Sequence, residues 1–327
     1  MIVRVTRGEL VESVHEIAAC VTDARGVVSF ATGDIERPVF LRSTAKPFIA
    51  AAVVASGAAD RFAFDDRELA VVAASHAGER FHVDAVRGIL AKIGLDETAL
   101  LCGAHAPANE RAAAELAAAG EPPSALHNNC SGKHAGILAT CVHLGFDLAT
   151  YVLPDHPAQQ RILALCARLA GTTAGALPLG VDGCGIPAYA TSLRRAAQSF
   201  ARFATLREVS DDDALALRRV RTALQAEPRY VAGTGRFDTA LIEATGGRIV
   251  GKAGAEGVHG DALLAEAAGL ALKVLDGSRR AAAPAALALF ERIGALKTGE
   301  TAALREFASP AVRSVSGTAV GRVEAVA

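Results

Sequence analysis

A serine and a lysine stand three residues apart in the stretch RSTAKPF, which runs from Arg42 to Phe48. If a helix begins near Ser43, the side chains of Ser43 and Lys46 share one face, with Cβ atoms about 5–6 Å apart. A lysine can take the proton of a serine nucleophile once its pKa falls from roughly 10.4 to about 8. Pro47 is tolerated only near a helix start. The spacing therefore predicts either a nucleophile with its base or the polar first turn of a core helix.

A second serine and a second lysine occur further along the chain. Ser75 and His76 end the apolar run AVVAAS just before Gly78, a pattern typical of an exposed turn at the lip of a cleft. Lys252 lies in RIVGKAGAEG, a short β-prone segment between glycines, where a backbone can approach a ligand closely. A buried Lys252 could activate Ser75 or lower the pKa of Lys46. The competing interpretation is a loop serine and a solvated lysine.

Two cysteine motifs carry further chemistry. The segment HNNCSGKHAGILA presents Cys130, Lys133 and His134 at an expected helix N-terminus, which favours a thiolate and attracts anions. The segment LGVDGCGIPAYA presents Asp182 and Cys184 in a glycine-rich turn. Two cysteines with a third ligand could hold zinc, although the close ligand spacing of a structural zinc site is missing. A pair of loop cysteines beside an active site and a redox-responsive thiol pair are the alternatives.

The arrangement of expected elements indicates one domain with two lobes. Residues 1–42 look like strands, and residues from 43 to about 225 show alanine-rich helical periodicity. From about 228 onward, glycine turns alternate with short β-prone runs before two further helices. We therefore predict an α/β (α+β) domain over 1–327. Segments 1–42 and 228–327 would form a sheet-containing lobe, and 43–227 a mainly helical one.

Composition narrows the class of partner. The 327 residues carry a net charge of −1, which argues against nucleic acid or an anionic membrane as a partner and favours a small molecule. The first residues lack the basic and apolar regions of a signal peptide, so we expect a soluble, cytoplasmic protein. Six dispersed cysteines do not suggest a disulfide framework. Four of them lie in apolar surroundings typical of small buried side chains: Cys20, Cys102, Cys141 and Cys166.

One motif is expected to mislead. LKTGE contains the Lys-Thr-Gly triplet of β-lactamases, with Lys297 as its lysine, but it lies between two helical patterns. A catalytic triplet of this kind belongs on a strand at a sheet edge, where the segment around Lys252 is better placed. We interpret Lys297 as a solvated turn residue.

In combination, six segments resemble one family along nearly the whole chain. They are LRSTAKPF, AASHAGE, NNCSGKHAG, VDGCGIP, VAGTGRFD and GKAGAEG, in this order. The chain resembles the Rhizobium etli type of L-asparaginase, the class 3 or asparaginase II family. That resemblance implies hydrolysis of L-asparagine to L-aspartate and ammonia, a homodimer, and a fold similar to serine β-lactamases and penicillin-binding proteins.

The resemblance also assigns roles to individual residues. It implies paired Ser–Lys catalysis by Ser43 with Lys46 and by Ser75 with Lys252. Its zinc site, formed by two thiolates, a lysine amine and water, falls on Cys130, Lys133 and Cys184. Candidate substrate-contact residues in or beside the matched segments are Arg42, Ser131, Gly132, His134 and Asp182; Asp182 would orient either the substrate ammonium or the zinc-bound water.

Several alternatives stay open at this point. Either serine could be the nucleophile, and zinc could be catalytic, substrate-positioning or structural. A glutaminase differs from an asparaginase by one methylene of substrate, which changes binding by only about 1–3 kcal/mol in an apolar pocket. A β-lactam or peptide hydrolase of the same fold and a non-catalytic zinc or thiol sensor are further alternatives.

Overall fold

The computed structural model describes residues 1–326 and divides them into two compact units. Unit 1 comprises 1–44, 191–205 and 240–326, and unit 2 comprises 45–190 and 206–239. The segment 191–205 lies within the part of the sequence predicted to be helical, and it belongs to the unit that contains the large sheet.

The strands are short except for the second. They are β1 (Ile2–Arg7), β2 (Leu10–Thr22), β3 (Val28–Thr32), β4 (Pro38–Phe40), β5 (Leu179–Val181), β6 (Pro187–Ser192), β7 (Ile249–Ala253), β8 (Val258–Leu263), β9 (Ala268–Val274), β10 (Ala311–Arg313) and β11 (Ala319–Val326).

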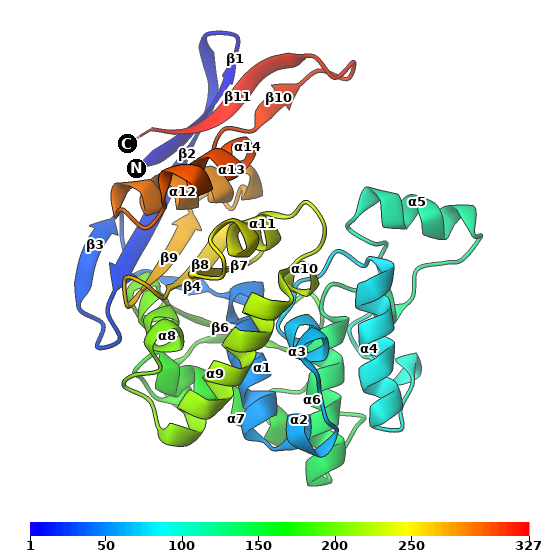
Figure 1. Ribbon diagram of the computed structural model, residues 1–327. Helices are drawn as coiled ribbons and strands as arrows, with labels where there is room; N and C mark the ends of the chain where they lie inside the picture. Colours follow the sequence, from blue (N-terminus) through cyan, green and yellow to red (C-terminus); the bar gives the residue numbers. More distant parts are fainter. Residues whose placement is uncertain (327) are drawn as a thin grey trace. The chain divides into compact units, whose positions relative to one another are not determined.

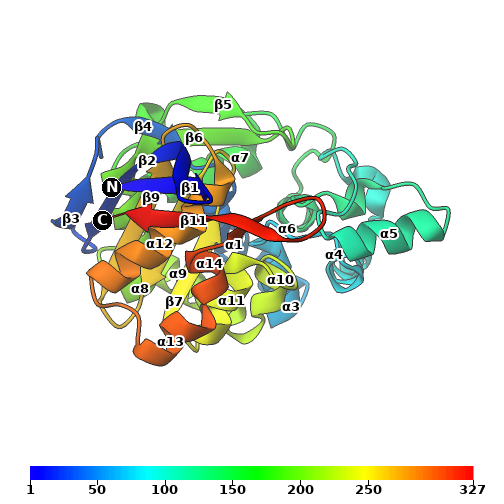
Figure 2. The same ribbon diagram turned by 90° about the horizontal axis from the view of Figure 1, so that it is seen from above.

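The sheet of unit 1 is built from both ends of the described chain. Its order is β10-β11-β1-β2-β9-β8-β7, with β3 paired to β2. Figures 1 and 2 show β1 beside β11, and the register pairs Ile2 with Val326. β7 lies at one edge of this order, where Lys252 pairs with Gly260 of β8. The expected strand around Lys252 is thus present and at a sheet edge.

The α-helices are distributed over both units. They are α1 (Lys46–Ala55), α2 (Ala58–Arg61), α3 (Asp66–Val72), α4 (Arg80–Lys92), α5 (Glu110–Ala118), α6 (Ser131–Leu144), α7 (Pro157–Leu169), α8 (Leu193–Thr205), α9 (Asp211–Ala226), α10 (Pro228–Val231), α11 (Phe237–Ala244), α12 (Ala282–Arg292), α13 (Thr298–Ala303) and α14 (Arg305–Ala308). The 3₁₀ turns are η1 (Arg42–Ala45), η2 (Glu97–Ala99), η3 (Ala125–His127), η4 (Ala174–Ala176) and η5 (Arg279–Ala281).

Glycines let α8 lie directly on the sheet of unit 1. A Cβ atom on Gly269 of β9 would lie 2.1 Å from the carbonyl oxygen of Ala197, and one on Gly260 would lie 2.1 Å from the ring of Phe200. Phe200 is fully buried in this contact. The absence of side chains at the two glycines therefore creates the space that α8 fills.

The same device brings two helices of unit 2 together. Gly132 and Gly136 lie one turn apart on α6, and Cβ atoms there would meet the Val71 carbonyl oxygen at 2.2 Å and the Val72 side chain at 2.6 Å. Helix α6 therefore packs on the last turn of α3. This contact places the start of α6 near the loop that follows α3, which contains Ser75.

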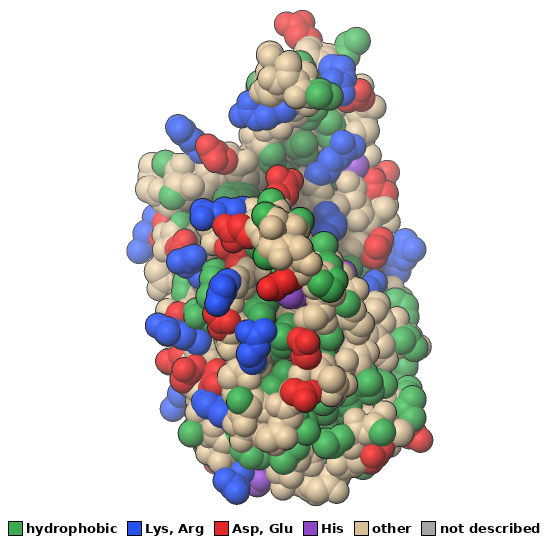
Figure 3. All heavy atoms as spheres, turned by 90° about the vertical axis from the view of Figure 1, so that its right-hand side faces the viewer, with side chains coloured by type: hydrophobic (Ala, Val, Ile, Leu, Met, Phe, Trp, Pro, Cys, Tyr) green, Lys and Arg blue, Asp and Glu red, His purple; other side chains and the backbone are tan. Residues whose placement is uncertain are grey.

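The surface and the hydropathy add two observations. On the face drawn in Figure 3, acidic and basic side chains are interspersed, in keeping with the near-zero net charge. Within residues 1–326, no helix combines the length and apolarity needed to cross a membrane.

We expect Gly269→Ala to destabilise the protein by at least about 1–3 kcal/mol, because the added methyl group overlaps the backbone of α8. Gly299→Ala is the matched control: it lies in α13, and a Cβ there meets nothing within 4 Å. The control should stabilise by up to about 1 kcal/mol, since alanine is the better helix former. Urea unfolding measures both, and equal stability of the two variants would contradict the packing argument.

Candidate active site

The segment that carries Ser43 and Lys46 is a continuous helical start. Ser43 lies in η1, and α1 begins directly at Lys46 with Pro47 in its first turn. The side chain of Lys46 is fully buried, and its Nζ atom donates to the carbonyl oxygen of Asn129 at 3.0 Å. Burial of a lysine disfavours its charged form. A buried position is what a lysine base requires. The same burial is also expected for the first turn of a core helix, so both interpretations of the Ser43–Lys46 spacing fit.

Arg42 precedes Ser43 in an unusual backbone conformation. Its φ angle is 52°, in the left-handed region that non-glycine residues rarely adopt, and its side chain is half-buried. Such strain persists where the surrounding structure enforces it, which is common at functional sites. The substrate-binding role of Arg42 stays a prediction.

Ser75 lies in the loop after α3, whose start is closed by a capping box between Asp65 and Glu68. Its backbone N–H donates to the carbonyl oxygen of Val231 at 3.2 Å, and the residue is half-buried. The expectation of an exposed turn is wrong for His76, which is 1% exposed.

His76 is part of a hydrogen-bond chain that explains its burial. Its Nδ1 atom accepts from the backbone of Gly78 at 3.2 Å, and its Nε2 atom is 2.9 Å from Ser131 Oγ. Ser131 Oγ in turn donates to the carbonyl oxygen of Leu126 at 2.9 Å. The Ser131 hydroxyl thus has two internal partners, and Gly132 beside it faces α3. The substrate-binding roles proposed for these two residues stay predictions.

Three of the predicted ligand residues come together at the start of α6. Cys130 is the N-cap of α6, and Lys133 lies in its first turn. Lys133 Nζ donates to Cys184 Sγ at 3.0 Å, and the thiols of Cys130 and Cys184 are hydrogen-bonded to each other. All three side chains are buried. Asp182 is close enough to act electrostatically on Cys130 and Lys133.

The electrostatics of this cluster favour one thiolate. The hydrogen bond from Cys184 holds the pKa of Cys130 well below its ordinary range, with a contribution from Lys133. That hydrogen bond and burial raise the pKa of Cys184. Burial alone would lower the pKa of Lys133, but Cys130, Cys184 and Asp182 outweigh it and raise it. The metal-free cluster is therefore an ionised Cys130 beside a charged Lys133.

The donor set is compatible with zinc. Two sulfur atoms and one amine are ligands of the kind that zinc accepts in a four-coordinate site with one open position. Binding would require Lys133 and Cys184 to release their protons, as is usual for metal ligation. Residues 1–326 contain no group of three or more His, Cys, Asp or Glu side chains arranged to hold a metal. A metal here would therefore depend on the lysine.

Next to this cluster, His134 has a buried ring nitrogen with no partner among the described residues. His134 Nδ1 is 2.6 Å from the hydroxyl of Tyr151, and that hydroxyl accepts from the backbone of Leu101 at 2.9 Å. Burial, with Lys133 and Lys46, holds the pKa of His134 well below its ordinary value, so the ring is neutral. The neutral ring can carry its proton on Nδ1, which contacts Tyr151, or on Nε2. The Nε2 atom is buried and has no hydrogen-bond partner within the described chain.

The sequence motifs did not identify two residues of this region as part of the site. Tyr151 is fully buried and orients His134, but it lies 17 positions away in an unremarkable loop. Asn128 accepts from the backbone N–H of Cys130 at 2.8 Å. Its signal was present in the letters NNC, because asparagine commonly bonds the backbone two residues onward.

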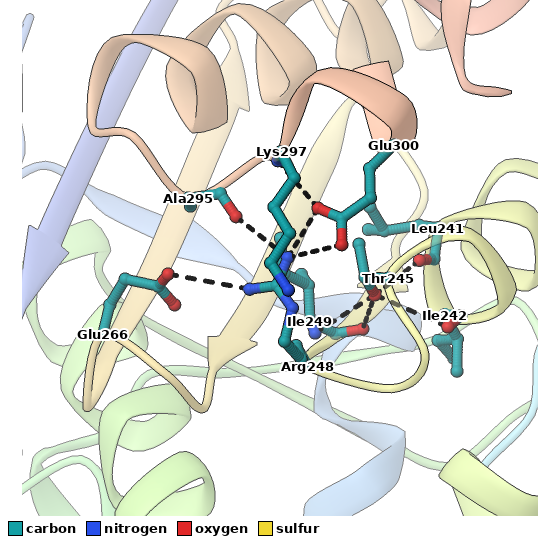
Figure 4. A network of polar contacts seen from close by, with 9 residues as sticks. All are labelled: Leu241, Ile242, Thr245, Arg248, Ile249, Glu266, Ala295, Lys297 and Glu300. Atoms are coloured by element: carbon teal, nitrogen blue, oxygen red, sulfur yellow. Dashed lines mark hydrogen bonds and ion pairs between the residues drawn. The ribbon is translucent and has the colours of Figure 1, made fainter. Parts of the chain in front are cut away.

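Lys252 belongs to unit 1 and is 1% exposed on β7. Its Nζ atom donates to the carbonyl oxygen of Ala253 at 2.6 Å. Arg248 precedes the strand and is anchored to Glu300 at 2.5–2.7 Å and to Glu266 at 3.9 Å, as Figure 4 shows. The pairing of Lys252 with Ser75, which lies in unit 2, stays a prediction.

The Lys-Thr-Gly triplet has a structural role. Lys297 is exposed and immediately precedes α13, where its backbone N–H donates to Glu300 at 2.8 Å (Figure 4). Its position between α12 and α13 is the one expected from the sequence. The four cysteines expected to be small buried side chains are buried and free: Cys20, Cys102, Cys141 and Cys166.

Comparison with known proteins identifies the family. Residues 3–325 match the L-asparaginase II family, and the chain therefore belongs to it. It is an amidohydrolase enzyme of the asparaginase type. No curated protein matches the sequence significantly.

Solved structures give a weaker likeness. A crystal structure of Mglu is 14% identical with a TM-score of 0.39, over 85% of this chain and 67% of that one. Mglu in its native form is 15% identical with a TM-score of 0.40, over 85% of this chain and 61% of that one. In a third structure, Mglu in its tris and glutamate form, this chain spans 59% of the length. Scores this low carry no argument about fold or activity.

The stacked pair of His76 and His82 predicts a loss of stability in acid. Their ring centroids are 5.0 Å apart, and burial lowers the pKa of His82 to about 4. The unfolded imidazole binds a proton near ~6.5, so stability present above that pH is lost as pH falls toward 4. From pH 7 to 5 the contribution of His82 is about 2 kcal/mol.

Urea unfolding at both pH values tests this expectation. His82→Gln should lose about 2 kcal/mol less than the wild type between pH 7 and pH 5. Glutamine can still donate to the carbonyl oxygen of Arg229, which His82 Nε2 contacts at 3.1 Å. Equal losses in the two proteins would show that His82 is not the group responsible.

Proposed function

We propose that this amidohydrolase converts L-asparagine to L-aspartate and ammonia by Ser–Lys acyl transfer. The family match supports the reaction class, since it spans every motif position. The observation that carries the mechanism is the full burial of Lys46, three residues after Ser43 at the start of α1. A buried amine loses its proton more readily than an exposed one and can act as a base near neutral pH.

In this mechanism Ser43 attacks the side-chain amide carbon while its proton passes to Lys46. The amide nitrogen takes up a proton and leaves as ammonia, which leaves a β-aspartyl ester on Ser43. Water then cleaves the ester, giving aspartate and free Ser43. Ser75 and Lys252 relay protons. Arg42 binds the substrate. The enzyme is a homodimer, and its fold is of the serine β-lactamase and penicillin-binding-protein type. The edge strand that carries Lys252 supports this fold.

The cluster at the start of α6 supplies substrate binding. When bound, zinc would provide a positive charge at Cys130, Lys133 and Cys184 that holds a polar group of the substrate. The Nε2 atom of His134 is buried and has no described partner, and in the tautomer that carries its proton there it is a donor suited to a carboxylate or carbonyl oxygen. Asp182, in the turn before Cys184, is suited to an ammonium group. Together these groups match the charges of an α-amino acid better than those of a β-lactam or a long peptide.

We expect Ser43→Ala to lower kcat for ammonia release from L-asparagine by at least about 10³-fold. Lys46→Met, which keeps length and removes the base, should lower it by about 10²–10⁴-fold. Lys297→Met is the matched control, because Lys297 is exposed in the misleading triplet, and it should stay within about twofold of wild type. Ammonia release from L-glutamine, measured in parallel, tests the substrate preference. A Ser43→Ala enzyme with wild-type turnover would move the nucleophile to Ser75 or reject the mechanism.

Cys184→Ser separates the metal from the chemistry. It should remove zinc from the purified protein and raise KM for L-asparagine by about 10–100-fold, with a smaller fall in kcat, because the cluster binds substrate without supplying the nucleophile. Elemental analysis and steady-state kinetics measure the two effects. Wild-type protein that purifies without zinc and takes up none would remove the metal from the proposal.

A further inference from the structure

One peptide unit, between Asn129 and Cys130, is held from both sides by side chains of unit 2. Its carbonyl oxygen accepts from Lys46 Nζ at 3.0 Å, and its N–H donates to Asn128 Oδ1 at 2.8 Å. The same rigid group therefore contacts the proposed base and carries the backbone nitrogen of a proposed zinc ligand. A peptide unit is planar, so neither end can move without the other.

Asn128 is itself fixed in orientation. Its Nδ2 atom donates to the carbonyl oxygens of Cys102 and Gly103 at 2.8 and 3.0 Å. Only the amide nitrogen can face two carbonyls, so Oδ1 must face the N–H of Cys130. Asn128 is 6% exposed, and its own carbonyl oxygen accepts from Ser131 N at 2.9 Å. The side chain thus joins the loop at 102–103 to the first turn of α6.

Removal of Oδ1 would leave a buried N–H without a partner. Cys130 is 5% exposed, so water does not readily replace the lost acceptor. A buried N–H without an acceptor is costly, and this cost favours rotation of the peptide toward another acceptor. That rotation would displace the carbonyl that holds Lys46 and turn the Cα atom that bears the Cys130 thiol.

We propose that Asn128 is a positioning residue that sets Lys46 and Cys130 at once, through the peptide unit between Asn129 and Cys130. The inference rests on the proposed function, in which Lys46 is the base and Cys130 a zinc ligand. It links proton transfer and metal binding through one side chain that contacts neither the substrate nor the metal. A carbonyl accepts from a neutral amine as well as from an ammonium, so the contact holds Lys46 in either state.

The test is Asn128→Ala, with two readouts on one preparation. Cadmium is the probe for the cluster, followed by its thiolate-to-metal ultraviolet absorption, and ammonia release from L-asparagine reports on Lys46. We expect cadmium affinity to fall about 10–100-fold and kcat to fall by a similar factor, with KM changed much less. Asn109→Ala is the matched control, because Asn109 caps α5 by accepting from Ala112 N at 3.0 Å. It should lower the melting temperature, because a helix cap is lost, and leave both readouts unchanged.

Asn128→Asp distinguishes positioning from general support. Aspartate keeps an acceptor for the N–H of Cys130 but loses the donor to the carbonyls of Cys102 and Gly103. Positioning through Oδ1 predicts a lower melting temperature, with kcat and cadmium affinity within about threefold of wild type or, for cadmium, tighter. This variant carries the test alone if Asn128→Ala does not fold.

The outcomes separate the two proposals. Folded Asn128→Ala with wild-type cadmium affinity and kcat would overturn the role of Asn128, as would equal losses of both in Asn128→Asp. A wild type that releases no ammonia would overturn the proposed function instead. In that case cadmium affinity alone decides the role of Asn128: a tenfold or greater loss in Asn128→Ala supports it, and a smaller change overturns it.

Discussion

The site in unit 2 depends on amines and thiols being buried beside specific hydrogen-bond partners. Lys46 and Lys133 are at most 1% exposed, and each has a partner that accepts from its Nζ atom. Removing such groups from water is costly unless they are paired. The surrounding backbone must therefore be placed accurately, because a misplaced acceptor would leave a buried amine unpaired. This constraint explains why the loop at 126–130 is so fully hydrogen-bonded.

Close packing of small residues makes this placement possible. Gly132 and Gly136 let α6 lie against α3, and this brings the Cys130 end of α6 to the loop of Ser75 and His76. His76 then bonds Ser131, the first residue of α6. In unit 1, Gly260 and Gly269 admit α8 to the sheet that presents Lys252 on its edge. In both units, glycines allow the close packing that positions the candidate site residues.

The cluster of Cys130, Lys133 and Cys184 contains opposite charges, and metal binding would change its protonation state. Without metal, a thiolate at Cys130 and an ammonium at Lys133 stabilise each other in a buried setting. With zinc, the same three atoms would all be deprotonated and would share one positive ion. Burial holds the pKa of the neighbouring His134 well below its ordinary value, so its ring is neutral.

Patterns within short segments of the sequence predicted the local features of this protein. Helical periodicity and the tolerance of proline in a first turn predicted a helix start near Ser43, where η1 leads into α1. Glycines around a β-prone run predicted the strand of Lys252. The helical patterns on both sides of Lys297 excluded it as a catalytic lysine. The six motifs in their order indicated the family. Each of these local features depends on the types of residues within a few positions along the chain.

Contacts between residues that are distant in the sequence became known from the three-dimensional fold. Helical spacing relates Cys130 to Lys133, but Cys184 joins them from 51 positions beyond Lys133. His76 was expected at an exposed turn and is buried, because α6 covers it and offers Ser131 as a partner. Tyr151 and Asn128 contact the loop at 101–103, which is distant from both in the sequence. The free energy of those contacts comes from burial and long-range hydrogen bonds, which no local pattern encodes.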